Sequence, residues 1–139
     1  MLKTTLYSFE GRIGRLRYFG YGLLAVVLNG IVLGIGAGLV RETSWVIPGA
    51  ILAFAGFVSM VWSGLALAAK RLHDMDLSAH HLWWIYGVSA FGGAAQQISS
   101  VVAALVGAFE FGVGIWMLFK RGTDGPNRFG PPAVPPRGP

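Results

Sequence analysis

The sequence predicts an all-α fold: a polytopic helical membrane protein with four transmembrane helices and both termini in the cytoplasm. Two observations lead to this prediction. Of the 139 residues, 54% are hydrophobic and only 12% are charged, whereas soluble domains carry about 25% charged residues. The few charges also collect in short clusters between long uncharged stretches. Such a chain has too little polar material to cover a globule in water, and its uncharged stretches have the length that a bilayer requires.

The first two spans are predicted at about residues 18–40 and 45–69, which contain no charged side chain. Each is long enough to cross about 30 Å of hydrocarbon with some tilt. The polar break between them, RETS, is short, so the second helix must return antiparallel to the first. Trp45 suits the membrane interface, and Pro48 falls in a first helical turn, where a missing N–H costs little. The first stretch exceeds the roughly 7–15 apolar residues of a signal peptide, so we expect it to be retained as a span.

The basic segment 1–17 precedes the first span and carries apolar residues at helical spacing, namely Leu6, Phe9, Ile13 and Leu16. This spacing predicts a short helix lying along the lipid headgroups with its apolar side down. Gly11 and Gly14 weaken such a helix by up to about 1 kcal/mol each. A loosely ordered basic leader is the alternative, and the sequence leaves the two open.

Residues 82–119 contain a single charge, Glu110. One helix of this length would reach about 57 Å, almost twice the hydrocarbon thickness. Two spans at about 80–96 and 98–119, with a turn at Gln96 and Gln97, fit the bilayer instead. Four spans in all place every Lys and Arg except Arg41 on one side, whereas three would move four of them across: Lys120, Arg121, Arg128 and Arg137. The positive-inside rule therefore favours four spans, with the basic side in the cytoplasm.

Two polar segments are predicted on that cytoplasmic side. Residues 70–81, KRLHDMDLSAHH, are expected to form a loop in which Arg71 pairs with Asp74 one helical turn away. Its histidines and acids lack any established metal-ligand spacing, so no metal site is predicted. The membrane domain should end near residue 121 and be followed by a Pro- and Gly-rich tail, 122–139. Its first part favours tight turns whose amides, beside basic residues, suit a lipid phosphate, and its end should be extended or disordered.

Glu110 is predicted near the middle of the membrane, about 15 Å along a helix from Lys120. An acid at that depth costs at least a few kcal/mol unless it is protonated or paired. It is therefore either a proton-exchanging site or a hydrogen-bonded acid that holds two helices together. Uncharged candidate partners are Asn29, Gln96, Gln97, Ser99 and Ser100.

Gly30, Gly34 and Gly38 recur every four residues along the first predicted span. Small residues at this spacing let membrane helices approach closely. Packing within the chain is the favoured interpretation, and homodimerisation is the alternative.

Several classes of function lack support in the sequence. There is no cysteine, which excludes thiolate catalysis, zinc–thiolate sites and iron–sulfur ligation. No nucleotide-binding motif occurs, and no nucleophile–base pair can be assembled, so neither an enzyme nor a cofactor is predicted. The basic residues flank the apolar stretches and do not form one basic face, so no nucleic acid is expected as a partner.

Three connecting segments together resemble the bacterial domain-of-unknown-function 805 family, small inner-membrane proteins of the YhaH type. The segments are FEGRIGR before the first span, RLHD after the second and GTDGPNRFGP after the last. The resemblance covers nearly the whole chain and implies a multi-pass location in the bacterial plasma membrane, without implying a mechanism. The residues of these motifs, whose role is unknown, are Gly11, Arg12, Arg15, Arg71, His73, Asp74, Gly122, Gly125, Asn127, Arg128 and Gly130.

The leading hypothesis is a non-enzymatic helical bundle whose basic cytoplasmic face binds partners. Those partners would be membrane lipids, including anionic headgroups, other membrane proteins or further copies of the chain. The alternative is a small oligomeric transporter or channel that uses Glu110.

Overall fold

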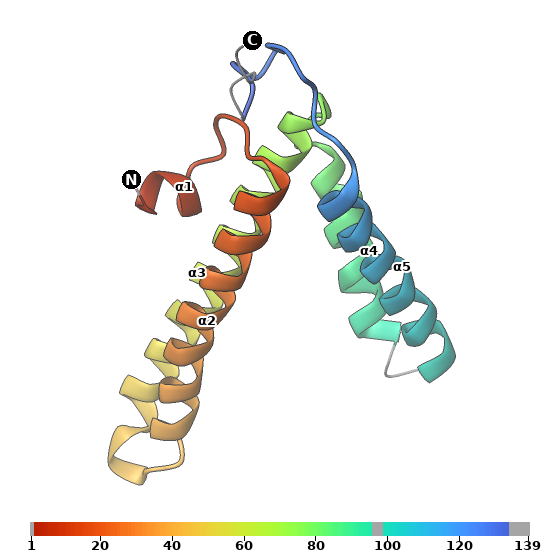
Figure 1. The fold of residues 1–139 in the computed structure, drawn as a ribbon. Helices are drawn as coiled ribbons and strands as arrows, with labels where there is room; N and C mark the ends of the chain where they lie inside the picture. Colours follow the sequence, from red (N-terminus) through yellow and green to blue (C-terminus); the bar gives the residue numbers. More distant parts are fainter. Residues whose placement is uncertain (1, 96–98, 134–139) are drawn as a thin grey trace. The chain divides into compact units, whose positions relative to one another are not determined.

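The computed structural model describes the whole chain except residues 1, 96–98 and 134–139. The described residues form α-helices and no named strand, which confirms the predicted all-α class. The helices are α1 (Leu2–Tyr7), α2 (Arg15–Leu39), the 3-10 helix η1 (Thr43–Trp45), α3 (Val46–Asp74), α4 (His81–Ala95) and α5 (Ser100–Phe119), labelled in Figure 1.

Three of the described helices are long and apolar enough to cross a membrane: Arg15–Leu39, Thr43–Asp74 and Ser100–Phe119. Many of their large apolar side chains point outward. Ile47, Ile51 and Phe54 on α3 are 73%, 64% and 69% exposed. Apolar surface of this extent is consistent with a membrane protein, because lipid then supplies the missing contacts. The helix α4, with 15 residues, would reach only about 22 Å and is not one of the three.

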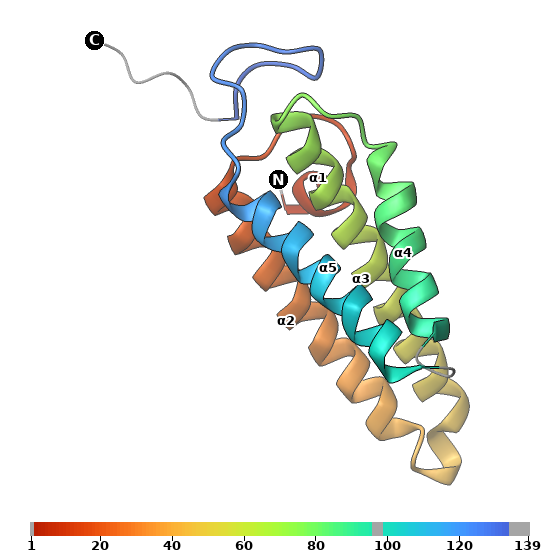
Figure 2. The same cartoon turned by 90° about the vertical axis from the view of Figure 1, so that its right-hand side faces the viewer.

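The described residues form two compact units, one of residues 2–9 and 19–67 and the other of residues 10–18, 68–95 and 99–133. In the first unit α2 and α3 lie side by side and antiparallel, joined by a short connection (Figures 1 and 2). The sequence predicts this return from the shortness of the polar break. The first residues of the chain also belong to this unit, through Tyr7, whose hydroxyl lies 2.6 Å from Ser59 Oγ and whose carbonyl accepts from Trp62 Nε1 at 3.0 Å.

The close contact between α2 and α3 is made by glycines other than those predicted. A Cβ on Gly36 would lie 2.5 Å from the backbone nitrogen of Ala53, so only glycine allows this approach. Gly30, Gly34 and Gly38 are exposed, and a Cβ there would meet no atom within 4 Å. These three glycines therefore do not make the contact between α2 and α3, and their packing elsewhere stays a prediction. The spacing of four indicated that α2 is rich in small residues, but it did not indicate which face of α2 packs against α3.

The segment before α2 does not form the single amphipathic helix that residues 1–17 suggest. The helix α1 ends at Tyr7, and Gly11 has a φ of +87°, which interrupts any continuation. Leu6 and Ile13 are buried, whereas Leu16 is 89% exposed on α2. The apolar spacing thus found two buried residues but overestimated the length of the helix.

In the second unit α4 and α5 form an antiparallel hairpin (Figures 1 and 2). A Cβ on Gly92 of α4 would lie 2.4 Å from the side chain of Val106, so the two helices approach closely there. Ser99 caps α5 by accepting a hydrogen bond from the amide of Val102 at 3.5 Å. The turn predicted at Gln96 and Gln97 lies outside the described residues.

Candidate functional site

The last turn of α3 is polar and yet buried. Lys70, Arg71, His73 and Asp74 are 5%, 0%, 9% and 5% exposed. The predicted loop from residue 70 onward is therefore wrong for residues 70–74, which continue α3 to Asp74. Basic residues in a last helical turn interact favourably with the helix dipole, and these also find partners in two other segments of the chain.

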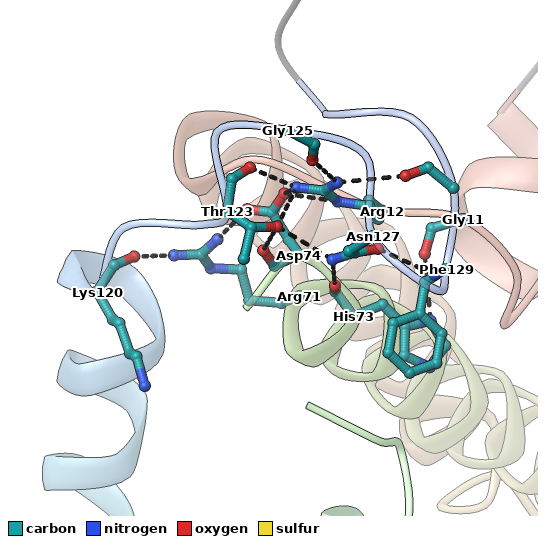
Figure 3. A network of polar contacts seen from close by, with 11 residues as sticks. Gly11, Arg12, Arg71, His73, Asp74, Lys120, Thr123, Gly125, Asn127 and Phe129 are labelled. Atoms are coloured by element: carbon teal, nitrogen blue, oxygen red, sulfur yellow. Dashed lines mark hydrogen bonds and ion pairs between the residues drawn. The ribbon is translucent and has the colours of Figure 1, made fainter. Parts of the chain in front are cut away.

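Asp74 lies between two guanidinium groups (Figure 3). Its Oδ1 lies 3.1 Å from Nη2 of Arg12, and its Oδ2 lies 2.6 Å from Nη1 of Arg71. The Arg71–Asp74 pair confirms the sequence prediction, whereas the pairing with Arg12 was not predicted. All three side chains are at least nine-tenths buried. Both oxygens of the carboxylate are thus occupied, and the three groups together carry one excess positive charge.

Arg12 also holds the segment that follows α5. Its Nη2 donates to the carbonyl oxygen and the hydroxyl of Thr123 at 2.7 and 2.8 Å. Its Nη1 donates to the carbonyl oxygens of Gly125 at 2.7 Å and Gly130 at 3.3 Å. A planar guanidinium with five donors suits this task, because one side chain satisfies several carbonyls at fixed angles.

Arg71 binds the other end of the same connection, at the C-terminus of α5. Its Nε donates to the carbonyl oxygen of Met117 at 2.7 Å, and its Nη2 donates to that of Lys120. Arg15 donates to the carbonyl oxygen of Phe119 at 3.3 Å. The last carbonyls of a helix have no partner within it, and basic side chains are suitable caps. These bonds fix the last turn of α5 beside the last turn of α3.

His73 and Asn127 complete the cluster. The Nδ1–H of His73 donates to the carbonyl oxygen of Gly11 at 3.2 Å, and its ring stacks on Phe129 with centroids 3.9 Å apart. Asn127 Nδ2 donates to the carbonyl oxygen of His73 at 2.8 Å, while Asn127 Oδ1 accepts from the amide of Phe129 at 2.9 Å. We call Arg12, Arg71, His73, Asp74, Thr123 and Asn127 the polar clasp.

Three motif glycines are required by the backbone of this cluster. A Cβ on Gly122 would lie 2.0 Å from Oδ2 of Asp74, so any other residue would displace the carboxylate. Gly11 and Gly130 have φ values of +87° and +123°, which other residues rarely adopt. The segment 122–130, for which the sequence predicts tight turns, is therefore part of the folded second unit. Residues 134–139, most of its predicted disordered end, lie outside the described residues.

The structure thus brings most of the motif residues into one place. Nine of them belong to the polar clasp or touch it directly: Gly11, Arg12, Arg71, His73, Asp74, Gly122, Gly125, Asn127 and Gly130. Arg15, the first residue of α2, lies at its edge and donates to Phe119 of α5, and Arg128 forms an exposed ion pair with Asp76 at 3.4 Å. Sequence reasoning missed Thr123 and Phe129. Their position within the third motif was the only signal that pointed to them.

The interactions of the polar clasp hold segments of the chain together. Within the described residues every buried side-chain nitrogen or oxygen has a hydrogen-bond partner. No group of three or more metal-binding side chains occurs in that part of the chain. Both carboxylate oxygens of Asp74 are held by arginines, and His73 donates from Nδ1 to Gly11 and stacks on Phe129. A fully satisfied buried network of this kind specifies one arrangement of the segments that it joins.

Glu110 lies apart from the polar clasp, on α5. It lines a cavity of about 380 Å³ between α4 and α5, together with the hydroxyl-bearing residues Ser89 and Ser100. Of its predicted partners, Ser100 shares this cavity, whereas Asn29 donates to the carbonyl of Ala25 at 2.8 Å within α2. Ser99 caps α5, and the two glutamines lie outside the described residues. A role in proton exchange and a role in holding the hairpin both remain predictions.

Comparison with known proteins gives one result. A family model described as a protein of unknown function, DUF805, matches residues 6–131. The matched range contains the whole polar clasp and the helices α2 to α5, together with the last two residues of α1. No curated protein and no solved structure matches the chain.

Proposed function

The chain belongs to DUF805, a family of proteins of unknown function, and from this premise we propose that it is a non-enzymatic, multi-pass protein of the bacterial plasma membrane that binds anionic lipid headgroups beside the polar clasp. The observation that carries the proposal is the engagement of the motif residues with one another. They fasten the ends of α3 and α5 together and leave a separate set of basic side chains exposed around them.

The fastening supports an even number of crossings. Arg71 belongs to the last turn of α3 and caps the last turn of α5, which supports the inference that both helices end at the same side of the bilayer. If α3 and α5 both cross, the chain between them must return, and α4 supplies that return. Its length of about 22 Å requires help from residues beyond its ends or a locally thinned bilayer. We therefore infer four crossings with both ends on one side.

The charge distribution supports a cytoplasmic position for the polar clasp. Every Lys and Arg except Arg41 then lies on the cytoplasmic side. Arg41 lies in the connection between α2 and η1, at the opposite end of the hairpin. This is the asymmetry that orients helical membrane proteins in bacteria.

Exposed basic residues beside the polar clasp supply the affinity for anionic lipid. We call Arg15, Arg17, Lys120 and Arg121 the basic collar; all four are exposed. The hydrogen bond from Arg15 to Phe119 brings the two halves of the collar together. Basic residues close to an anionic surface contribute about 1 kcal/mol each, so the collar is expected to contribute about 4 kcal/mol at low salt. Salt screens this attraction.

The test compares two basic sites on the same chain. The double variant Arg17→Gln with Arg121→Gln removes two collar charges and leaves the clasp intact. We expect the enrichment of phosphatidylglycerol over phosphatidylcholine among co-purified lipids to fall by up to about 30-fold at low salt. This factor corresponds to the loss of about 2 kcal/mol of binding free energy from two basic residues. Lipid mass spectrometry after extraction from mixed nanodiscs measures it. Arg41→Gln, also an exposed arginine, is the control and should leave the enrichment unchanged. Equal enrichment in all three proteins would contradict lipid binding by the collar.

A second candidate function is favoured by the cavity beside Glu110. A carboxylate and two serines facing about 380 Å³ between membrane helices would suit proton-coupled passage of a small solute, through an oligomer. Proton flux into proteoliposomes that Glu110→Gln abolishes, and that Glu42→Gln in an exposed connection preserves, would support it. Wild-type vesicles without such flux would exclude it.

A further inference from the structure

A second cavity, of about 460 Å³, lies in the second unit near the end where α3 and α5 meet. Its walls come from α3, α4, α5 and the connection after α3. They are almost wholly apolar and aromatic: Leu72, Leu77, His81, Trp84, Ile85, Phe109, Gly112, Val113 and Trp116. None of these residues belongs to the polar clasp or to the basic collar, so the cavity is a separate feature.

One wall of the cavity follows α5. Phe109, Gly112 and Trp116 lie on one helical face at spacings of three and four, over about 10 Å of helix. Opposite them, α4 contributes Trp84, whose ring lies 6.0 Å from that of Phe109. The absence of a side chain at Gly112 keeps the wall open, since a Cβ there would meet no atom within 4 Å.

A basic side chain lies at one end of the cavity. Lys120 Nζ lies 4.7 Å above the ring of Trp116, which forms the wall next to the C-terminus of α5. His81 stands at the start of α4, where its Nδ1 accepts from Trp84 Nε1 at 3.2 Å. The described walls are therefore almost wholly apolar, with a cationic group beside Trp116.

These features suit an apolar chain with a negatively charged head. The walls are almost wholly apolar around about 460 Å³, and water does not fill cavities without polar partners. The basic side chain at one end complements an anionic head. Lipid surrounds these helices if they span the membrane.

We propose that this cavity holds one acyl chain of an anionic phospholipid, with the phosphate beside Lys120. The inference rests on the proposed binding of anionic lipid and adds a defined site to it. The basic collar attracts anionic headgroups in general, whereas this cavity would retain a single lipid in a fixed place. Such a lipid would fill the hairpin of α4 and α5 beside the polar clasp.

The first test uses the unaltered full chain. It is reconstituted into nanodiscs that contain phosphatidylglycerol with a photoreactive diazirine on its acyl chain, and labelled peptides are identified by mass spectrometry. We expect labelling concentrated at residues 81–85 and 109–116. Labelling spread evenly over the exposed faces of α2 and α3, or equal labelling by the matching phosphatidylcholine probe, would overturn the inference.

The second test fills the cavity. Gly112→Leu should reduce labelling of these segments at least about fivefold, because its side chain occupies the space of the acyl chain. Gly114→Leu is the matched control, since it adds the same side chain on the same helix, also where a Cβ meets no atom within 4 Å, but outside the cavity wall. If Gly112→Leu leaves the labelling unchanged while the collar double variant still lowers the lipid enrichment, this inference is overturned and the proposed function stands. If the collar double variant also leaves the enrichment unchanged, the proposed function is overturned as well.

Discussion

Replacing Asp74 by asparagine keeps the shape of the side chain and removes its charge. In the wild type one carboxylate faces two buried guanidinium groups, at 3.1 Å from Arg12 and 2.6 Å from Arg71. Asparagine offers one acceptor oxygen and turns an N–H donor toward the other arginine. Breaking a buried ion pair by removing one partner costs about 3–5 kcal/mol, because a charge remains buried without compensation. We therefore expect Asp74→Asn to lower the free energy of unfolding by about 4 kcal/mol, roughly a thousandfold in the folding equilibrium.

The assay is reversible unfolding of the purified chain in mixed micelles, followed by circular dichroism as the fraction of denaturing detergent rises. Asp76→Asn is the control, because Asp76 follows Asp74 by two residues and also pairs with an arginine, Arg128. Both side chains of this pair are about half exposed, at 49% and 60%. Exposed pairs contribute about 0–1 kcal/mol. Asp76 has a φ of 59°, a conformation that asparagine tolerates well.

A double-mutant cycle identifies the interaction itself. If Asp74 stabilises the chain through Arg12, Arg12→Gln combined with Asp74→Asn should cost less than the sum of the two single changes by at least about 1 kcal/mol. Strict additivity would refute the account of the polar clasp. So would a cost for Asp74→Asn no larger than that of Asp76→Asn.

Two further predictions use matched glycines. Gly122→Ala should lower the free energy of unfolding by about 2–4 kcal/mol in the same detergent titration, because its Cβ would displace the carboxylate of Asp74. Gly125→Ala should cost less than about 1 kcal/mol, because no atom lies within 4 Å of its Cβ. Gly36→Ala should cost about 1–3 kcal/mol by forcing apart α2 and α3, and Gly34→Ala on the exposed face should be neutral or stabilising; equal effects at Gly36 and Gly34 would contradict the packing described for the hairpin.

The helices were predictable because composition alone encodes them. A charge-free stretch of span length has few other stable structures in lipid, so residues 18–40 and 45–69 correspond closely to α2 and α3. The exact ends were not predictable. The helix α3 continues to Asp74 because Arg71 and Asp74 gain partners from distant segments, and no local pattern contains those partners.

The polar clasp was predictable only in part. The spacing of three between Arg71 and Asp74 suggests their ion pair, which the structure confirms. The contact between Arg12 and Asp74 joins residues 62 positions apart, and one sequence carries no signal for such a pairing. The sequence suggests an exposed basic face, whereas Arg12 and Arg71 are buried with Asp74 in the structure. Likewise the packing face of α2 depends on how α3 lies against it, which is why Gly36 was missed.

The central claim is that α3 and α5 end on the same, cytoplasmic side of the membrane. Because the chain has no cysteine, single cysteines at positions 43, 96 and 124 can be labelled one at a time in intact cells with a membrane-impermeant maleimide. Asp124 suits this test since it is exposed and, unlike its neighbour Thr123, is not part of the polar clasp. We expect labelling at positions 43 and 96 from outside, and at position 124 only after lysis. Labelling of position 124 in intact cells would contradict the account.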